Sequence, residues 1–351
     1  MVRVKIIGAG GFGGVGMIEL LQRHPMAKVA WLVDVENVGK PISDVQPHLR
    51  GICDMPILSP DQAPTEGVDA VVSATPDRVG MSHAAAHVKA GARVIDYSGD
   101  FRFRTPEIYA DYARTIGLEP KHLAPELLPQ SSYGLTELHR EEIRKAKVVG
   151  NPGCFAVSII LGMGPAVKAK IIDLSRVIAD SKTGASGAGK KPSATLHFPA
   201  RYENMNAYKI LKHQHRFEVE TELSKLAGSP VQVVLTTQLV PLSRGIMSTL
   251  YGQLDAGWVN AKKIYEVYQA AYGRERFVRL MPLGEASSNA AVRGSNFCDV
   301  SIHVEERTGT LLVVSHIDNL VKGQAGSALQ NLNVACGLEE TAGLMFPGQF
   351  P

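Results

Sequence analysis

The sequence predicts an α/β protein in which a doubly wound parallel sheet is followed by an α+β domain. Two observations carry this prediction. Strand and helix patterns alternate over residues 1–150, which is the order that builds a parallel sheet with helices on both faces. From residue 151 on, the strand patterns are longer and the helices are set apart from them, which is typical of an α+β domain.

Length and composition fit two globular domains and argue against several other classes. A chain of 351 residues with 45% hydrophobic and 20% charged residues has enough apolar material for two cores. The net charge of +3, without a basic run interleaved with aromatic residues, argues against nucleic acid as the main partner. We expect no secretion leader, since the sequence enters a strand pattern at residues 2–7 without a charged and then apolar stretch. We expect no membrane segment, since no apolar run reaches roughly 18 residues. Four scattered cysteines without a C-x-x-C motif predict a cytoplasmic protein with reduced thiols.

The chain begins with a strand, a glycine-rich turn and a helix. Residues 2–7 form the strand pattern, residues 17–21 begin the helix, and the turn between them holds the candidate cofactor-binding glycines Gly8, Gly11, Gly13 and Gly14. In this context glycines let backbone N–H groups approach a pyrophosphate at a helix N-terminus, as in Rossmann-type dinucleotide sites. A G-x-x-G-x-x-G spacing fits as well as others, and a tight turn without a ligand is the alternative interpretation.

The later patterns define the two domains. Strands are expected at 29–33, 68–74, 93–96 and 147–149, with a helix at 79–90. We expect a dinucleotide-binding domain over 1–150, joined by a C-terminal helix within about 320–351. The α+β domain over 151–319 has strand patterns at 177–182, 231–240 and 248–254, a loop at 183–192, and a hairpin of 297–304 with 310–317.

Cys154 is the candidate nucleophile. It follows the turn Asn151-Pro152-Gly153 and precedes a densely apolar helix pattern over 155–170. A thiol at the start of a helix ionises more readily, because unpaired N–H groups and the helix dipole favour an anion, and the thiolate is the nucleophile. The alternative is a buried cysteine that only fills space.

A cysteine nucleophile needs an acid–base partner, which is usually a histidine. His213 and His215 are the candidates. Positions i and i+2 do not share a helix face and no third ligand is suggested, so we expect no metal site. A solvated polar helix start is the alternative interpretation of this pair. Arg102 follows the strand at 93–96 and could hold an anion through two N–H groups. From its position alone, a surface ion pair is the favoured interpretation.

Taken together, these features resemble the phosphorylating semialdehyde dehydrogenases over nearly the whole chain, and among them the N-acetyl-gamma-glutamyl-phosphate reductase family of arginine biosynthesis. The matching segments are 96–102, 150–154, 182–189, 204–218, 241–246 and 317–323. Several motifs in the right order are much more specific than any one of them. Departures from the family pattern occur at Thr136, Ala156, Val157, Gln214, Arg216 and Phe217, and they bear on the acyl substituent more than on the chemistry.

The resemblance implies a role for each matched position. Cys154 would attack an acyl phosphate and His215, the second histidine of its motif, would act as the acid–base group. The implied substrate-binding residues are Arg102, Glu218 and Arg244, and the implied cofactor-binding residues of the second domain are Ser186, Gly187 and Asn319. The resemblance also implies a catalytic and oligomerisation role for the second domain and a homo-oligomer, dimer or tetramer.

The implied reaction is the reduction of N-acetyl-glutamyl 5-phosphate to its semialdehyde through a cysteine thioester. Relatives with the same chemistry stay open: aspartate-semialdehyde dehydrogenase, and a lysine-pathway reductase of carrier-linked aminoadipyl phosphate, for which Lys190 and Lys191 are the only hint of a basic rim. A redox-sensing dinucleotide binder with Cys154 as sensor would need no histidine. A cysteine hydrolase would explain none of the N-terminal glycines.

The cofactor is the point where resemblance and local chemistry disagree. The family generally uses NADP, and its second strand usually ends in serine and arginine. Here Asp34 ends that strand, 20 residues after Gly14, where a carboxylate hydrogen-bonds a free ribose 2′-hydroxyl. A 2′-phosphate about 4 Å away would meet a repulsion of about 4 kcal/mol at an effective dielectric constant of 20. The sequence therefore predicts that NAD(H) is tolerated or preferred, unless Arg78 or Lys40 offsets the charge.

Overall fold

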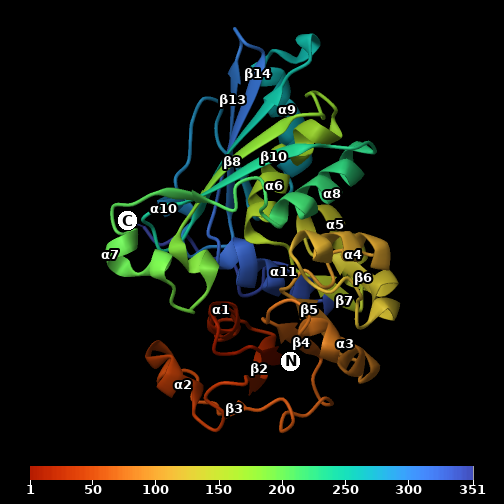
Figure 1. Cartoon of the computed structure of the whole chain (residues 1–351), viewed down its shortest axis with the longest axis vertical. Coiled ribbons are helices and arrows are strands. Elements are labelled where there is room, and N and C mark those ends of the chain that lie inside the picture. Colours follow the sequence, from red (N-terminus) through yellow and green to blue (C-terminus); the bar gives the residue numbers. More distant parts are fainter. Residues whose placement is uncertain (351) are drawn as a thin grey trace. The chain divides into compact units, whose positions relative to one another are not determined.

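The computed structural model describes residues 1–350 and divides into two compact units (Figure 1). Unit 1 contains Met1–Pro152 and Gln324–Met345, and unit 2 contains Gly153–Gly323 and the tail that begins at Phe346. The α/β fold class with a second, mixed domain is confirmed. The expected boundaries at 150 and 319 lie within a few residues of the observed ones at 152 and 323. The tail from Phe346 on was expected in the first domain and lies in unit 2.

The tail lies with unit 2 because its backbone is bonded there. The N–H of Gln349 donates to the carbonyl of Arg293 at 2.6 Å, and the Arg293 guanidinium donates to the carbonyl of Gln349 at 2.8 Å. The helix expected within 320–351 therefore ends well before the terminus, at Ala335.

Within the described residues, unit 1 has a seven-stranded sheet in the order β3-β2-β1-β4-β5-β7-β6, and every neighbouring pair is parallel. The strands are β1 (Val2–Ile7), β2 (Ala27–Val33), β3 (Ile57–Leu58), β4 (Ala70–Ser73), β5 (Arg93–Asp96), β6 (Ser131–Tyr133) and β7 (Val148–Gly150). The helices are α1 (Phe12–Leu21), α2 (Ile42–Val45), α3 (Gly80–Lys89), α4 (Pro106–Thr115), α5 (Thr136–Lys145) and α11 (Gly326–Ala335). The strand order reverses between β1 and β4, and a doubly wound sheet binds its ligand at such a switch point.

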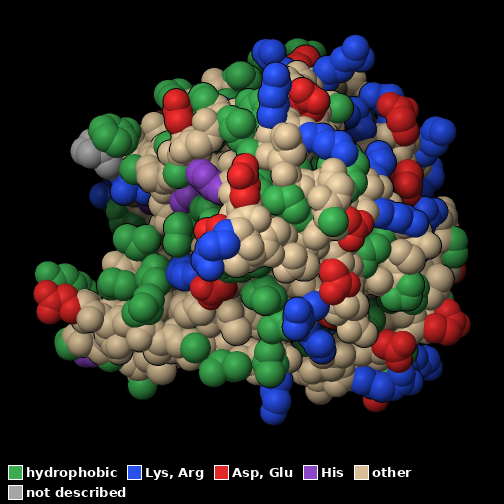
Figure 2. Space-filling view, turned by 90° about the horizontal axis from the view of Figure 1, so that it is seen from above, with side chains coloured by type: hydrophobic (Ala, Val, Ile, Leu, Met, Phe, Trp, Pro, Cys, Tyr) green, Lys and Arg blue, Asp and Glu red, His purple; other side chains and the backbone are tan. Residues whose placement is uncertain are grey.

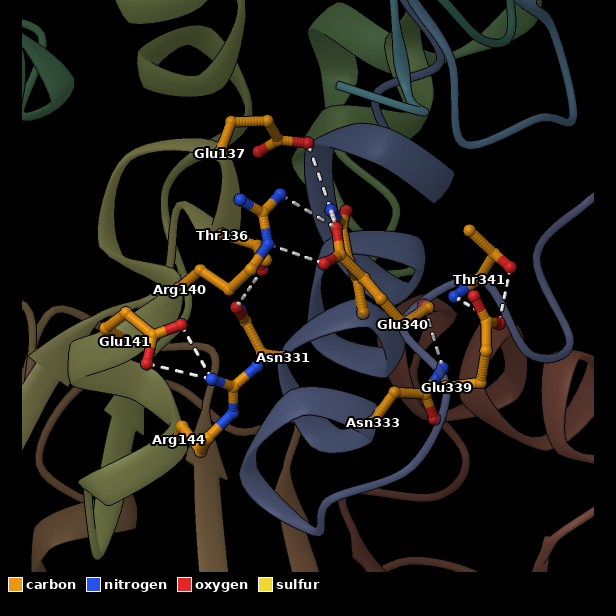
Figure 3. A network of polar contacts seen from close by, with 11 residues as sticks. Thr136, Glu137, Arg140, Glu141, Arg144, Asn331, Asn333, Glu339, Glu340 and Thr341 are labelled. Atoms are coloured by element: carbon orange, nitrogen blue, oxygen red, sulfur yellow. Dashed lines mark hydrogen bonds and ion pairs between the residues drawn. The ribbon is translucent and has the colours of Figure 1, made fainter. Parts of the chain in front are cut away.

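Helix α11 returns from the end of the sequence and packs against α1, α5 and β5. Figure 3 shows the polar contacts that join it and the residues after it to α5. The Thr136 hydroxyl donates to Asn331 at 2.8 Å, and the Arg140 guanidinium donates to both carboxylate oxygens of Glu340. Unit 1 is therefore completed by a segment that lies almost 200 residues away in sequence from α5.

Among the residues described, unit 2 has a seven-stranded mixed sheet in the order β12-β13-β14-β11-β8-β10-β9. The strands are β8 (Val177–Thr183), β9 (Asn206–Tyr208), β10 (Val233–Leu239), β11 (Ile246–Gln253), β12 (Val278–Leu280), β13 (Cys298–Glu305) and β14 (Thr310–Ile317). The helices are α6 (Cys154–Lys168), α7 (Phe198–Arg201), α8 (His215–Ala227), α9 (Ala261–Tyr272) and α10 (Asn289–Val292). The hairpin expected over 297–317 is the antiparallel pair of β13 and β14.

Helix α6 forms the centre of the unit 2 core. It is apolar on all sides, so every residue from Phe155 to Val167 is buried against the sheet and against α8 and α9. The opposite face of the sheet carries outward side chains at alternate positions, including Ile178, Val234 and Tyr251, each more than one-third exposed.

No helix in the described part of the chain combines the length and apolar character that crossing a bilayer requires. Basic and acidic side chains are interspersed on the face drawn in Figure 2.

Candidate active site

The turn before Cys154 is built as the sequence predicts. Gly153 has extended backbone and precedes α6, whose first residue is Cys154. The first hydrogen bond inside the helix is donated by Val157 to the carbonyl of Gly153. The N–H groups of Phe155 and Ala156 therefore precede the helical ladder, at the end of the helix where an anion is stabilised.

Asn151 anchors the start of this turn within unit 1. Its backbone N–H donates to the carbonyl of Asp96 at 2.7 Å, and its own carbonyl accepts from Nε of Arg102 at 2.8 Å. Its side-chain amide donates to the carbonyl of Gln324 and accepts from Nδ2 of Asn331. The side chain is buried, so four contacts fix the residue that leads into the turn.

Arg102 therefore has a structural task in addition to the anion-binding role that the sequence implies. A second N–H of its buried guanidinium donates to the carbonyl of Tyr97 at 2.7 Å. The guanidinium thus braces the carbonyls of Tyr97, just after the end of β5, and of Asn151, at the start of the nucleophile turn.

His215 and Glu218 both reach the backbone of Gly153 from the first turn of α8. A Cβ atom at Gly153 would lie 2.2 Å from Nε2 of His215, so the imidazole lies directly against the Cα of this glycine. Oε1 of Glu218 accepts the N–H of Gly153 at 2.9 Å, and this carboxylate is buried. The resemblance implied a substrate-binding role for Glu218, whereas this contact holds the nucleophile turn and removes one N–H from those that could bind an oxyanion.

Gly323 packs against the nucleophile itself. A Cβ atom there would lie 2.8 Å from Cβ of Cys154. A side chain at 153 would displace the imidazole of His215, and a side chain at 323 would displace Cys154, since real Cβ atoms do not approach so closely.

A cavity of about 400 Å³ opens over these residues within unit 2. Cys154, His213 and His215 line it together with Tyr208, and the loop residues Gly184 and Gly187 form another wall. Burial, followed by the nearby Cys154, raises the pKa of Tyr208, so this phenol stays neutral. The volume is of the size that small-molecule sites usually have.

His213 is buried rather than solvated. Its Nδ1 accepts the backbone N–H of His215 at 3.2 Å, and burial, followed by the charge of Lys209, lowers its pKa to about 4. It is therefore neutral at physiological pH. The interpretation of this pair as a solvated helix start does not apply to His213.

The loops around the cavity are tied to one another. Asn319 accepts the N–H of Gly245 at 2.7 Å and donates to the hydroxyl of Ser186 at 3.0 Å. Ser186 and Gly187 lie in a short 3₁₀ helix, η3 (Ala185–Ala188), where the sequence predicts a flexible loop. Arg244 forms an ion pair with the buried carboxylate of Asp318 at 3.1 Å. Ser186, Gly187 and Asn319 are thus brought together.

The glycine-rich turn of unit 1 has the close contacts of a ligand-binding cradle. Gly8 has a φ of 82°, which favours glycine, and a Cβ at Gly14 would lie 2.3 Å from the carbonyl oxygen of Gly8. A Cβ at Gly13 would lie 3.0 Å from the Tyr97 ring, whereas at Gly11 nothing but the Gly8 oxygen, 3.5 Å away, comes within 4 Å. A side chain at Gly8 or Gly14 would therefore clash with the backbone most severely.

Asp34 faces this turn. Its Oδ2 accepts the N–H of Gly10 at 2.8 Å, and its Oδ1 accepts the N–H groups of Val35 and Glu36. An ionised carboxylate has about four acceptor positions, so Oδ2 retains one. Of the two cations that could offset its charge, the Arg78 guanidinium donates to the carbonyls of Glu119 and Lys121, and Lys40 is exposed.

Family models and full-length relatives both assign the chain to the semialdehyde dehydrogenases. Residues 3–146 match the family model of the semialdehyde dehydrogenase NAD-binding domain, and residues 154–319 match that of the semialdehyde dehydrogenase dimerisation domain. Two relatives named N-acetyl-gamma-glutamyl-phosphate reductase are 43% and 42% identical, from Citrifermentans bemidjiense over 100% of both chains and from Syntrophobacter fumaroxidans over 98% of both. The chain belongs to the N-acetyl-gamma-glutamyl-phosphate reductase family.

Solved structures of more distant relatives share the fold of this family member. Aspartate semialdehyde dehydrogenase II from Vibrio cholerae has a TM-score of 0.70 at 17% identity and covers 95% of this chain and 97% of its own. Aspartate semialdehyde dehydrogenase with NADP from Candida albicans has a TM-score of 0.65 at 14% identity, covering 96% of this chain and 99% of its own.

Sequence reasoning missed the positions that act through contact rather than through chemistry. Asn151, Gly153 and Gly323 carry no reactive group, although each lies in a segment that matches the family. The sequence gives no sign that His213 is buried and bonded to the backbone of His215. Within the described residues there is no cluster of three or more potential metal ligands.

Proposed function

We propose that this protein reduces N-acetyl-gamma-glutamyl phosphate to the corresponding semialdehyde with a nicotinamide dinucleotide, a step of arginine biosynthesis. The observation that carries the proposal is the joint placement of Cys154 and His215. Cys154 begins α6, Nε2 of His215 lies against the adjacent Gly153, and both residues line a cavity of about 400 Å³. Full-length relatives at 42–43% identity carry the name of this activity.

In the first step, the thiolate of Cys154 attacks the carbonyl carbon of the acyl phosphate. A C–S bond forms, the C–O bond to phosphate breaks, and phosphate leaves. N–H groups at the start of α6 stabilise the oxyanion, each worth on the order of 10²–10³ in rate. We assign the phosphate contact to Arg102 or Arg244, because a guanidinium can bind a phosphate through two N–H groups.

When bound, the dinucleotide supplies the hydride that reduces the thioester carbon. His215 then donates a proton to the resulting oxyanion of the Cys154 adduct and takes it back as the C–S bond breaks. The products are the aldehyde and the regenerated thiolate. A histidine in this role contributes roughly 10²–10⁴ in rate.

The residues of unit 1 fit a dinucleotide. Glycine at positions 8 and 14 lets the turn pack closely against the neighbouring backbone, and a pyrophosphate would bind at the backbone N–H groups at the start of α1. We propose that Asp34 accepts the ribose 2′-hydroxyl of NAD through the remaining acceptor position of Oδ2, so that NAD is used far better than by NADP-selective relatives. Ser186, Gly187 and Asn319 are proposed to contact the nicotinamide half.

We propose a homo-oligomer in the cytoplasm, formed through the exposed sheet face of unit 2. The matching family model describes residues 154–319 as a dimerisation domain, and outward residues such as Ile178, Val234 and Tyr251 are apolar. Light scattering coupled to gel filtration would test this. Tyr251→Asp should reduce the molar mass, whereas an unchanged mass would place the interface elsewhere.

The deciding experiment is phosphate-dependent reduction of NAD or NADP with N-acetyl-glutamate semialdehyde as substrate. We expect turnover with this aldehyde and little with aspartate semialdehyde. Cys154→Ser should retain folding and dinucleotide binding and form no thioester. Turnover by Cys154→Ser at the wild-type rate would refute the assignment of the nucleophile.

A further inference from the structure

We propose that His213 is a positioning residue that caps α8 and holds the imidazole of His215 against the nucleophile turn. This inference rests on the proposed function, because it concerns the residue that acts as acid–base group there. It assigns a task to the first histidine of the pair, which the reaction itself does not use.

The start of α8 is capped by His213. The residue before the helix, Gln214, forms no side-chain cap, although the first N–H groups of a helix have no partner within it. Nδ1 of His213 takes this place by accepting the N–H of His215 at 3.2 Å. A side chain two residues upstream thus fixes the backbone of the acid–base residue.

The His213 ring also packs against its aromatic neighbours. The centroid of His213 lies 4.6 Å from that of His215, and 5.2 Å from Phe155, which meets it edge to face. The Tyr208 ring lies 5.9 Å away on another element. Since His213 is only 6% exposed, it forms a fixed wall for the His215 ring, which also lies against the Cα of Gly153 and 6.0 Å from the centroid of the Phe155 ring.

The protonation state of His213 fits this capping role. Nδ1 accepts a hydrogen bond from a backbone N–H, so it carries no proton, and the neutral ring has its proton on Nε2. Burial and the charge of Lys209 favour the neutral ring, whereas Tyr208 and His215, which also face it, are not acidic groups. Protonation would place two donors face to face and put a positive charge at a helix N-terminus, which the helix dipole disfavours.

This arrangement explains the spacing of the pair. Histidines at i and i+2 cannot share a helix face, but a residue two positions before the helix start can fold back onto the first N–H. One histidine is then outside the helix as its cap and the other is the first helical residue.

Three variants test the proposal in the full-length protein. His213→Leu removes the acceptor, and turnover should fall by up to about 100-fold with the KM for the dinucleotide unchanged, as expected for a misplaced catalytic group. His213→Asn keeps an oxygen near the position of Nδ1 and should retain most activity. His197→Asn alters an exposed histidine outside the cavity and should match the wild type.

A double-mutant cycle then separates positioning from an independent role. In the His215→Asn background, His213→Leu should cause no further loss of turnover; a second, multiplicative loss would overturn the proposal. The failure of the proposed function looks different, because His215→Asn alone would then keep wild-type turnover.

A measurement on the free protein adds a readout that a purely structural role would not move. The pH profile of Cys154 alkylation by iodoacetamide should shift in His213→Leu in the direction seen for His215→Asn. An unshifted profile in a folded His213→Leu protein would contradict the proposal. If this variant does not fold, His213→Gln replaces it, because its amide extends past the position of Nδ1.

Discussion

Oε1 of Glu218 accepts the backbone N–H of Gly153 at 2.9 Å and so joins the first turns of two helices, α8 and α6. The two residues are 65 positions apart in sequence. Because the bond is made by the residue directly before Cys154, any displacement of α8 is transmitted to the nucleophile. The same turn of α8 carries His215, so one rigid element places both the acid–base group and the turn that it serves.

The first prediction concerns this carboxylate. Glu218→Ala leaves the buried N–H of Gly153 without its acceptor, which should cost about 1–3 kcal/mol in the free energy of unfolding and slow alkylation of Cys154. Glu218→Gln keeps an acceptor oxygen and should be much milder in both respects. Urea unfolding and alkylation rates would check this, and equal defects in the two variants would show that the charge matters rather than the hydrogen bond.

The second prediction concerns Gly153. An alanine there would place Cβ 2.2 Å from Nε2 of His215, so the imidazole must move and turnover should fall by about 100-fold. The matched control is Gly164→Ala within α6, the helix that Gly153 precedes, where the nearest neighbouring atom would be 3.5 Å from the new Cβ. This control should be fully active and slightly stabilised, by about 0.5–1 kcal/mol. Full activity of Gly153→Ala would refute the placement of His215.

The third prediction concerns the cofactor. Asp34→Ser removes the negative charge near the ribose, so the ratio of kcat/KM for NADP over NAD should rise by roughly 10-fold or more. The control is Glu36→Ser, which changes an exposed neighbouring carboxylate and should alter the ratio little. A strong NADP preference in the wild type that Asp34→Ser leaves unchanged would show that Asp34 does not contact the ribose.

The fourth prediction concerns Asp96, a fully buried carboxyl at the end of β5. Its Oδ1 accepts the N–H and the hydroxyl of Ser98, and its Oδ2 faces the Cα of Gly80. Burial, followed by the charge of Asp100, raises the pKa of Asp96 to about 7. The folded protein therefore binds a proton that the unfolded chain releases near pH 4, and this contribution to stability is lost as the pH rises towards and through 7.

Asp96→Asn mimics the protonated carboxyl, so the variant should not lose this contribution to stability as the pH rises. Urea unfolding at pH 5 and pH 8 should show that the stability of the variant relative to the wild type is greater at pH 8 than at pH 5, by on the order of 2–4 kcal/mol. Asp61→Asn, at an exposed position, serves as the control. A relative stability of the variant that does not rise between pH 5 and pH 8 would contradict the raised pKa of Asp96.

The elements that the sequence could predict are those whose signal is local. The turn at Asn151-Pro152-Gly153 and the apolar run of α6 lie within a few residues of each other, so Cys154 could be placed at a helix start from the sequence alone. His215 could be chosen over His213 only by its place in the motif. The fold followed from the alternation of strands and helices, which the sheet orders confirm.

The contacts between distant segments could not be predicted. Nothing in the sequence around Glu218 indicates that its side chain meets Gly153, because a buried acceptor and a backbone donor leave no pattern. Asp34 shows the same limit. Its place at the end of β2 was predictable, but its bond to the N–H of Gly10 depends on how β1 and β2 pair.

Helix α11 sets an order of events for synthesis. Unit 1 packs α11 against α1, α5 and β5, yet the ribosome makes this helix only after all of unit 2 except its short tail. Until then Thr136 and the carbonyl of Gly134, which bind Asn331 in the finished protein, have to be satisfied by water. The N-terminal half must therefore wait for the last tenth of the chain, and residues 1–152 expressed alone should expose an apolar surface and aggregate.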